Sequence, residues 1–62
     1  MIWLSEILMQ EHDLRSFADL EDALRQRASQ GERFFGMDVK PPFSDTPANW
    51  EESLESIFVA RY

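Results

Sequence analysis

The sequence predicts a mostly α-helical domain of three helices, with a short extended segment between the second and the third. No glycine or proline occurs before Gly31, and apolar residues recur at helical spacing in three separate stretches. Apolar and polar residues then alternate from Phe34 to Val39. The alternative is a small α+β domain with two strands. In either case we expect residues 1–62 to form a single domain, because a chain this short supports only one thin core.

The first thirty residues are expected to form two helices with a break near residues 12–15. Apolar stripes are formed by Trp3, Leu4, Ile7 and Leu8 in the first helix, and by Phe17, Leu20, Leu24 and Ala28 in the second. Ser16 and Asp19 have the spacing of a capping box, and Gly31 suits the left-handed position that ends a helix. One uninterrupted helix is the rival interpretation, but two of its eight seam positions are polar.

The alternating stretch after Gly31 is typical of a strand or an extended arm. A lone strand leaves its backbone groups unpaired, so it needs a partner. That partner is either the N-terminal segment, which would then be a strand rather than a helix, or an edge on another chain. Pro41 and Pro42 follow, and two adjacent prolines form a stiff connector because they supply no amide donors.

The third helix is expected to begin with Thr46 as its cap and Pro47 at its first helical position. Glu51 and Glu52 would then lie near the positive end of the helix dipole. The buried stripe of this helix would consist of Trp50, Leu54, Ile57 and Phe58, with Arg61 further along.

Composition and charge restrict the classes of partner. Twelve acids against six bases give a net charge of −6, and a field of that sign repels nucleic acid and anionic lipid. We therefore expect a protein partner with a basic surface, and neither direct nucleic-acid binding nor membrane binding. The first six residues include Glu6 and no basic side chain, which is not the pattern of a secretory signal. A cytoplasmic location is expected.

Residues for catalysis or for binding a cofactor are not evident. The chain has no cysteine and a single histidine, His12, whose neighbours Glu11 and Asp13 diverge from it on a helix, so no metal site is expected. Two glycines are too few for a loop that cradles phosphate. The serines lack the glycine pattern of a nucleophile elbow. We expect a protein that is not an enzyme and has no cofactor.

Two groups of acids are candidate binding residues. Glu51 and Glu55 lie one helical turn apart, about 6 Å between neighbouring side chains, with Glu52 beside them. The second group consists of Asp19, Glu21 and Asp22. One interpretation is that these acids only form solvated faces that keep a small domain soluble. The other is that they imitate a phosphate backbone and occupy a basic groove.

The aromatic residues divide into two sets. Trp3, Phe17, Trp50 and Phe58 lie on the apolar stripes and are expected in the core. Phe34, Phe35, Phe43 and Tyr62 have no helical face to hide on, which makes them candidates for an exposed hot spot.

Two hypotheses for function follow. The first is a small acidic inhibitor or regulator of a nucleic-acid-handling complex, of the anti-defence or anti-CRISPR-like kind that phages encode, acting in the host cytoplasm as a nucleic-acid mimic. An antitoxin that neutralises a basic protein would share the same electrostatics. The alternative is a structural adaptor or a homo-oligomer, in its simplest form a homodimer, that pairs through residues 34–43.

Overall fold

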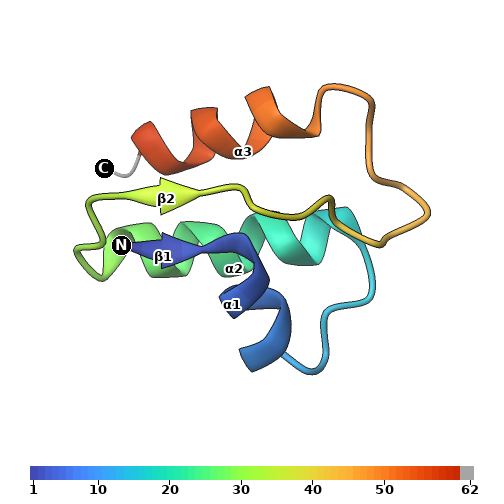
Figure 1. Ribbon diagram of the computed structural model, residues 1–62, viewed down its shortest axis with the longest axis horizontal. Coiled ribbons are helices and arrows are strands. Elements are labelled where there is room, and N and C mark those ends of the chain that lie inside the picture. The colour runs from blue at the N-terminus through green and yellow to red at the C-terminus, as the bar shows by residue number, and fades with distance from the viewer. Residues whose placement is uncertain (61–62) are drawn as a thin grey trace.

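The computed structural model describes residues 1–60, and within them the chain forms three helices and one two-stranded parallel sheet (Figure 1). Arg61 and Tyr62 lie outside the described residues. The elements follow in the order β1 (Ile2–Trp3), α1 (Leu4–Gln10), α2 (Phe17–Ser29), β2 (Phe35–Gly36) and α3 (Trp50–Val59). The prediction of a small, mostly α-helical domain is confirmed, and the short sheet supplies the two strands of the α+β alternative.

The N-terminal segment is a strand and a helix in succession. Ile2 and Trp3 pair with Phe35 and Gly36 in parallel register, and α1 begins at the next residue. Trp3 has the extended backbone of a strand, with φ −98° and ψ 145°, and is also the N-cap of α1. Its N–H donates to the Glu6 carboxylate at 3.1 Å. One extended residue therefore ends the strand and starts the helix.

The start of α2 is held by three side chains. Ser16 Oγ accepts a hydrogen bond from the Asp19 N–H at 3.2 Å, as the predicted capping box requires. The Asp19 carboxylate, however, accepts from the N–H of Arg15 at 3.0 Å and not from that of Ser16. Asp45, from the loop before α3, accepts from the Phe17 N–H at 2.9 Å. This last contact ties the start of α2 to a loop distant in sequence.

The ends of α1 and α2 agree with the two-helix prediction. The chain is not helical over residues 11–16, so the rival prediction of one uninterrupted helix is wrong. The last residue of α2 is Ser29, and Gly31 has a φ of +98°, which is the left-handed position predicted for it. The N–H of Gly31 donates to the carbonyl of Ala28 at 3.2 Å.

The third helix begins three residues later than predicted. Its N-cap is Asn49 and its first residue is Trp50. Thr46 does not cap it, because its hydroxyl donates to the carbonyl of Pro41 at 3.3 Å. Pro47 lies in a separate turn, in which its carbonyl accepts from the Trp50 N–H at 3.2 Å. Thr46 and Pro47, which were predicted to start the helix, therefore belong to the loop before it.

The extended segment forms a shorter strand than the alternation suggests. Within the predicted stretch from Phe34 to Val39, only Phe35 and Gly36 pair. Asp38 turns to the N-terminus of α1, where its carboxylate accepts from the Ser5 N–H at 3.1 Å and from Ser5 Oγ at 2.6 Å. The hydrogen bond from the Ser5 hydroxyl lowers the pKa of Asp38 below its ordinary value. After Gly36 the chain thus leaves the sheet and turns to the N-terminus of α1, where Asp38 accepts both hydrogen bonds.

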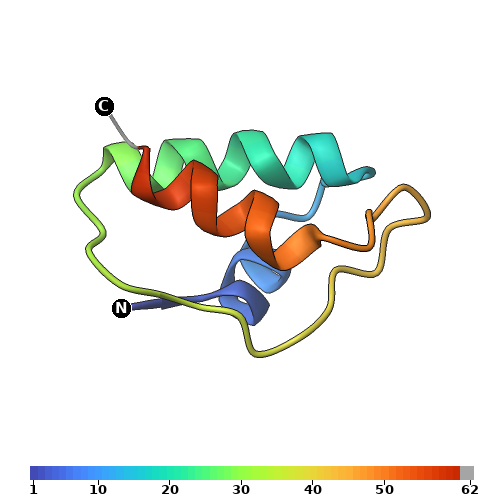
Figure 2. The ribbon, with the colours of Figure 1, turned by 90° about the horizontal axis from the view of Figure 1, so that it is seen from above.

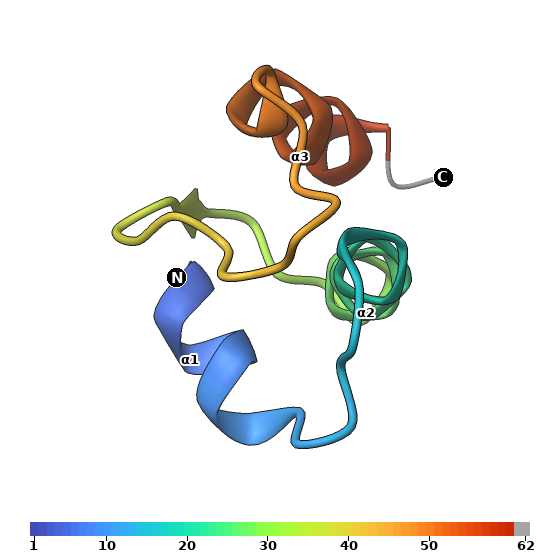
Figure 3. The ribbon, with the colours of Figure 1, turned by 90° about the vertical axis from the view of Figure 1, so that its right-hand side faces the viewer.

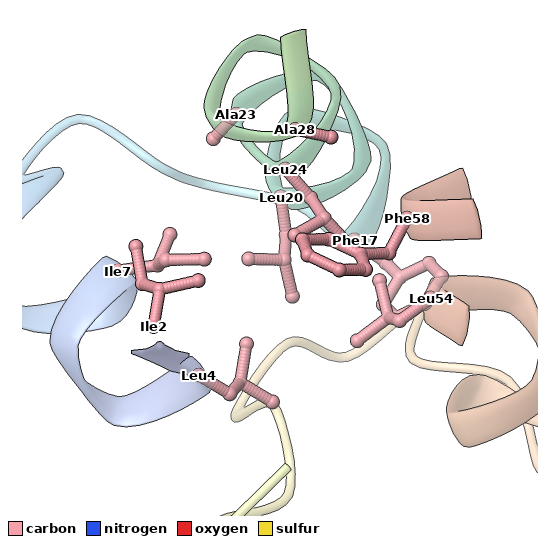
Figure 4. Packing of buried hydrophobic residues seen from close by; sticks show 10 residues of the cluster. All are labelled: Ile2, Leu4, Ile7, Phe17, Leu20, Ala23, Leu24, Ala28, Leu54 and Phe58. Atoms are coloured by element: carbon pink, nitrogen blue, oxygen red, sulfur yellow. The ribbon is translucent and has the colours of Figure 1, made fainter. Parts of the chain in front are cut away.

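The core lies between α2 and the other elements (Figure 4). The helices α2 and α3 run in the same direction and pack on each other (Figure 2), while α1 and the sheet cover another side of α2 (Figure 3). The buried residues are Ile2, Leu4, Ile7, Phe17, Leu20, Ala23, Leu24, Ala28, Leu54 and Phe58. None of the helices in the described part of the chain combines the length and apolarity needed to cross a membrane.

The four aromatics expected in the core do not all lie there. Phe17 and Phe58 are buried, and Trp50 is partly buried against the core. Trp3 is 41% exposed, so the prediction for this residue is wrong. Its neighbour Ile2 points into the core, and the side chains of successive strand residues point to opposite faces of a sheet.

Candidate protein-binding surface

Three carboxylates project from the outer side of α3. Glu51, Glu52 and Glu55 are exposed, and Glu51 and Glu52 lie in the first helical turn as predicted. Within residues 1–60 none of the three carboxylates makes a hydrogen bond or an ion pair. Leu54 and Phe58, on the buried side of the helix, lie in the core. We call Glu51, Glu52 and Glu55 the α3 acidic face.

A groove separates α3 from β2 and its flanking residues. It has a volume of about 390 Å³ and is lined by Arg33, Phe34, Phe35, Met37, Glu55, Phe58 and Val59. A second depression of about 270 Å³ on α3 is lined by Glu52, Glu55, Ser56 and Val59. We call the first hollow the β2–α3 groove. Because Glu55 and Val59 line both hollows, Glu52 and Glu55 of the α3 acidic face form one continuous surface with this groove.

Adjacent phenylalanines have different positions at this groove. Phe34 is 65% exposed, while Phe35 is partly buried and stacks on Phe58 with ring centroids 5.4 Å apart. This difference follows from the alternation of side chains along a strand. Phe43 lies elsewhere, partly buried against the core. Of the four aromatics predicted to form an exposed hot spot, Phe34 is the exposed one within the described residues, and Tyr62 lies outside them.

The second group of predicted acids does not join this surface. Asp19 and Asp22 line a shallow depression of about 220 Å³ beside the connection between α1 and α2, together with Glu11 and Asp13. The Asp22 carboxylate forms an ion pair with Arg25 at 2.8 Å.

Several of these side chains have local partners. Glu11 pairs with Arg27 at 3.2 Å, and Asp19 accepts the Arg15 N–H near the start of α2. Glu21, the remaining predicted acid, is only partly exposed on α2. Glu11, Asp19 and Asp22 thus have partners within the described residues, whereas the carboxylates of α3 have none there.

His12 is flanked by two acidic residues, Glu11 and Asp13. His12 and Asp13 are exposed in the turn after α1. Across residues 1–60, histidine and acidic side chains do not gather in any group of three that could hold a metal ion.

Two residues of the surface were not singled out from the sequence. Val59 is 62% exposed and lies four residues after Glu55, on the same side of α3, so helical spacing was a signal that could have found it. Arg33 was the other, because nothing in its immediate sequence indicates that it lines a groove. Its position depends on β2 lying next to α3.

Comparisons of the chain with protein-family models, curated proteins and solved structures give no match.

Proposed function

We propose that this protein is a non-catalytic binding protein that docks on a basic surface of a nucleic-acid-handling protein and inhibits or regulates it. The observation that carries the proposal is the α3 acidic face, where Glu51, Glu52 and Glu55 are exposed and have no partner within residues 1–60. Their charges are not neutralised locally, and they belong to a chain of net charge −6. Complementary charge steers such a surface to a basic partner.

Mimicry of nucleic acid is the mechanism that fits this face best. Glu51 and Glu55 are one helical turn apart, so their carboxylates form a short row along the helix. A basic groove that neutralises phosphates can accept such a row in place of a nucleic-acid strand. Binding would then exclude the nucleic acid by occupying its site. In the setting we propose, a phage encodes the protein and the partner lies in the host cytoplasm.

The apolar part of the surface would supply affinity that charge alone does not. Phe34 and Val59 are both more than half exposed and border the groove beside Glu55. Aromatic side chains that become buried in a partner pocket dominate the energetics of many interfaces. A partner site that is basic with an apolar hollow therefore fits this surface.

The proposal is tested by affinity capture from a bacterial lysate with the tagged full chain, followed by binding measurements with the recovered partner. The partner should be a nucleic-acid-binding protein, and both competing DNA and raised salt should displace it. Replacing Glu51, Glu52 and Glu55 together by glutamine should weaken binding at least about a hundredfold if each charge contributes about 1 kcal/mol.

A matched variant controls for net charge. The substitutions Asp13→Asn, Glu21→Gln and Asp22→Asn remove the same number of charges from α2 and from the turn after α1. This variant should keep its affinity for the partner. Full affinity in the α3 variant, or equal losses in both variants, would refute the proposed role of the α3 acidic face.

The second candidate function is a structural adaptor or a homodimer that pairs through the extended segment. Among residues 1–60 the sheet has two strands, so β2 has an edge that β1 does not cover. Replacing Phe34 by Asp should break such an assembly while leaving the core intact, because Phe34 is exposed. Analytical ultracentrifugation measures the mass of the assembly in solution. A monomeric wild-type mass, or a dimer that Phe34→Asp leaves unchanged, would refute this second candidate function.

A further inference from the structure

We propose that the β2–α3 groove receives an extended basic segment of the partner, which adds to the open edge of β2 as a third strand. This inference rests on the proposed function, since it names the part of the partner that the surface recognises. Three observations carry it: an unpaired backbone edge, an apolar groove beside that edge, and carboxylates on the groove wall.

The first observation is the unpaired backbone of Phe35. The Ile2 N–H donates to the Phe34 carbonyl at 2.9 Å, so Phe34 directs its carbonyl toward β1. In a parallel ladder the residue opposite Ile2, which is Phe35, directs its own N–H and C=O to the other side. Within residues 1–60 neither group has a hydrogen-bond partner, although Phe35 is partly buried. A backbone pair in this position is a ready template for another strand.

The second observation is that a groove borders this edge. Both Figure 1 and Figure 3 place β2 between β1 and α3, so the edge of β2 that β1 leaves open faces toward α3. The groove between them is lined by Phe35, Phe58 and Val59, among others, and Phe35 stacks on Phe58. Its walls therefore combine a strand edge with an apolar helix flank, an arrangement suited to peptides that bind by strand addition.

The third observation is the charge of the helix wall. Glu55 lines the groove and Glu52 lines the adjoining depression, and neither has a partner in the described chain. Arg33 lines the β2 side of the same groove. Two carboxylates along α3 thus select an occupant whose basic side chains point to the helix, while Arg33 places a basic group on the opposite wall.

A second copy of this chain fits the groove less well than a basic segment. Each copy carries a net charge of −6, and pairing through β2 would bring Glu55 of one copy near the same acidic wall of the other. Like charges that meet across an interface are unfavourable. The electrostatics of the edge therefore favour a partner of opposite charge.

The test uses the full chain and a short capped peptide in which lysine and valine alternate. Its matched control is the same peptide N-methylated at every second residue, which removes the amides that would donate to β2. Calorimetry should show that N-methylation weakens binding by about fivefold or more, the effect of losing one or two net hydrogen bonds. In NMR hydrogen exchange, the Phe35 amide should become protected when the unmodified peptide binds.

Charge variants locate the peptide on the groove. Glu55→Lys should weaken peptide binding several-fold, whereas Asp13→Lys, an equal change in the depression beside α1, should not.

Three results would overturn the inference. One is absence of peptide binding, and a second is equal affinity for the two peptides without protection of Phe35. The third is a dimer in which the Phe35 amide is already protected without peptide. None of these affects the proposed function, which is tested separately by the loss of the captured partner in the Glu51, Glu52 and Glu55 variant.

Discussion

Phe34 and Phe35 are adjacent, but the first is exposed and the second is partly buried. Replacing each in turn by aspartate therefore tests the binding surface and the stability of the fold separately. Phe34→Asp replaces a side chain that is 65% exposed, so the free energy of unfolding should change by no more than about 0.5 kcal/mol. Binding of the captured partner should weaken, because an apolar contact in the interface is replaced by a charge.

Phe35→Asp should instead damage the fold. Phe35 is partly buried and stacks on Phe58. Removing a partly buried ring costs about 2 kcal/mol, roughly half the cost for a fully buried one, and the aromatic pair adds about 1 kcal/mol. The total of about 3 kcal/mol is comparable to the net stability of about 3 to 5 kcal/mol that such a small core supplies. The melting temperature should fall by about 12 to 24 °C.

Thermal unfolding followed by circular dichroism measures both variants under the same conditions. Partner binding is then measured for each variant at a temperature at which it is folded. Equal melting temperatures for Phe34→Asp and Phe35→Asp would refute the assignment of the Phe34 ring to the surface and of the Phe35 ring to the packing against α3. A Phe34→Asp variant that is stable and binds normally would remove Phe34 from the binding surface.

Three further predictions concern the fold that presents this surface. Leu54→Ala removes a side chain that is 0% exposed, at a cost of about 3 to 5 kcal/mol, so chemical denaturation should show a largely unfolded chain; a cooperative transition near that of the wild type would contradict this. Asp38 has a lowered pKa, so the stability it contributes is present above its ordinary value of 3.8 and is lost as the pH falls through the lower pKa of the folded state. Melting temperatures from about pH 5 to pH 2 should therefore depend less on pH in Asp38→Asn than in the wild type, and parallel curves would refute this. Gly36→Ala would place a Cβ in steric overlap with the Trp3 ring, which must swing toward solvent. In a Trp50→Phe background the emission should shift to the red, with a stability loss of about 1 kcal/mol; an unchanged spectrum would show that the ring does not move.

Local signals in the sequence were sufficient for much of the helical structure. Gly31 is able to adopt a positive φ at little cost, and it follows the last turn of α2 as predicted. Ser16 caps the same helix because its hydroxyl reaches an amide only three residues away. The exposed acids of α3 were also predictable, since Leu54 and Phe58 define the buried side of that helix.

Tertiary contacts decided the features that the sequence did not predict. Thr46 had the character of a helix cap, but its hydroxyl bonds to Pro41 within the loop, and the helix begins only at Trp50. The N-terminal segment was one of two predicted partners for the extended segment, but its strand at Ile2 and Trp3 is two residues long, too short for alternation to show where it lies. It forms because β2 lies beside it.

In the candidate site, too, some features follow from spacing along the chain and others from tertiary contacts. Helical spacing brings Glu51 and Glu55 to one side of α3, so their grouping is a local property. Phe34 joins them only because β2 lies next to α3, and no spacing along the chain encodes that proximity.

The most direct measurement is an NMR map of the isotope-labelled full chain with its captured partner. We expect the largest signal changes at Glu51, Glu52, Glu55 and Val59 on α3 and at Phe34 beside β2. Signals from Asp13 and Asp22, on the separate acidic depression, should change little. The largest changes at that depression, with α3 unaffected, would contradict the proposal that this protein binds its partner through α3.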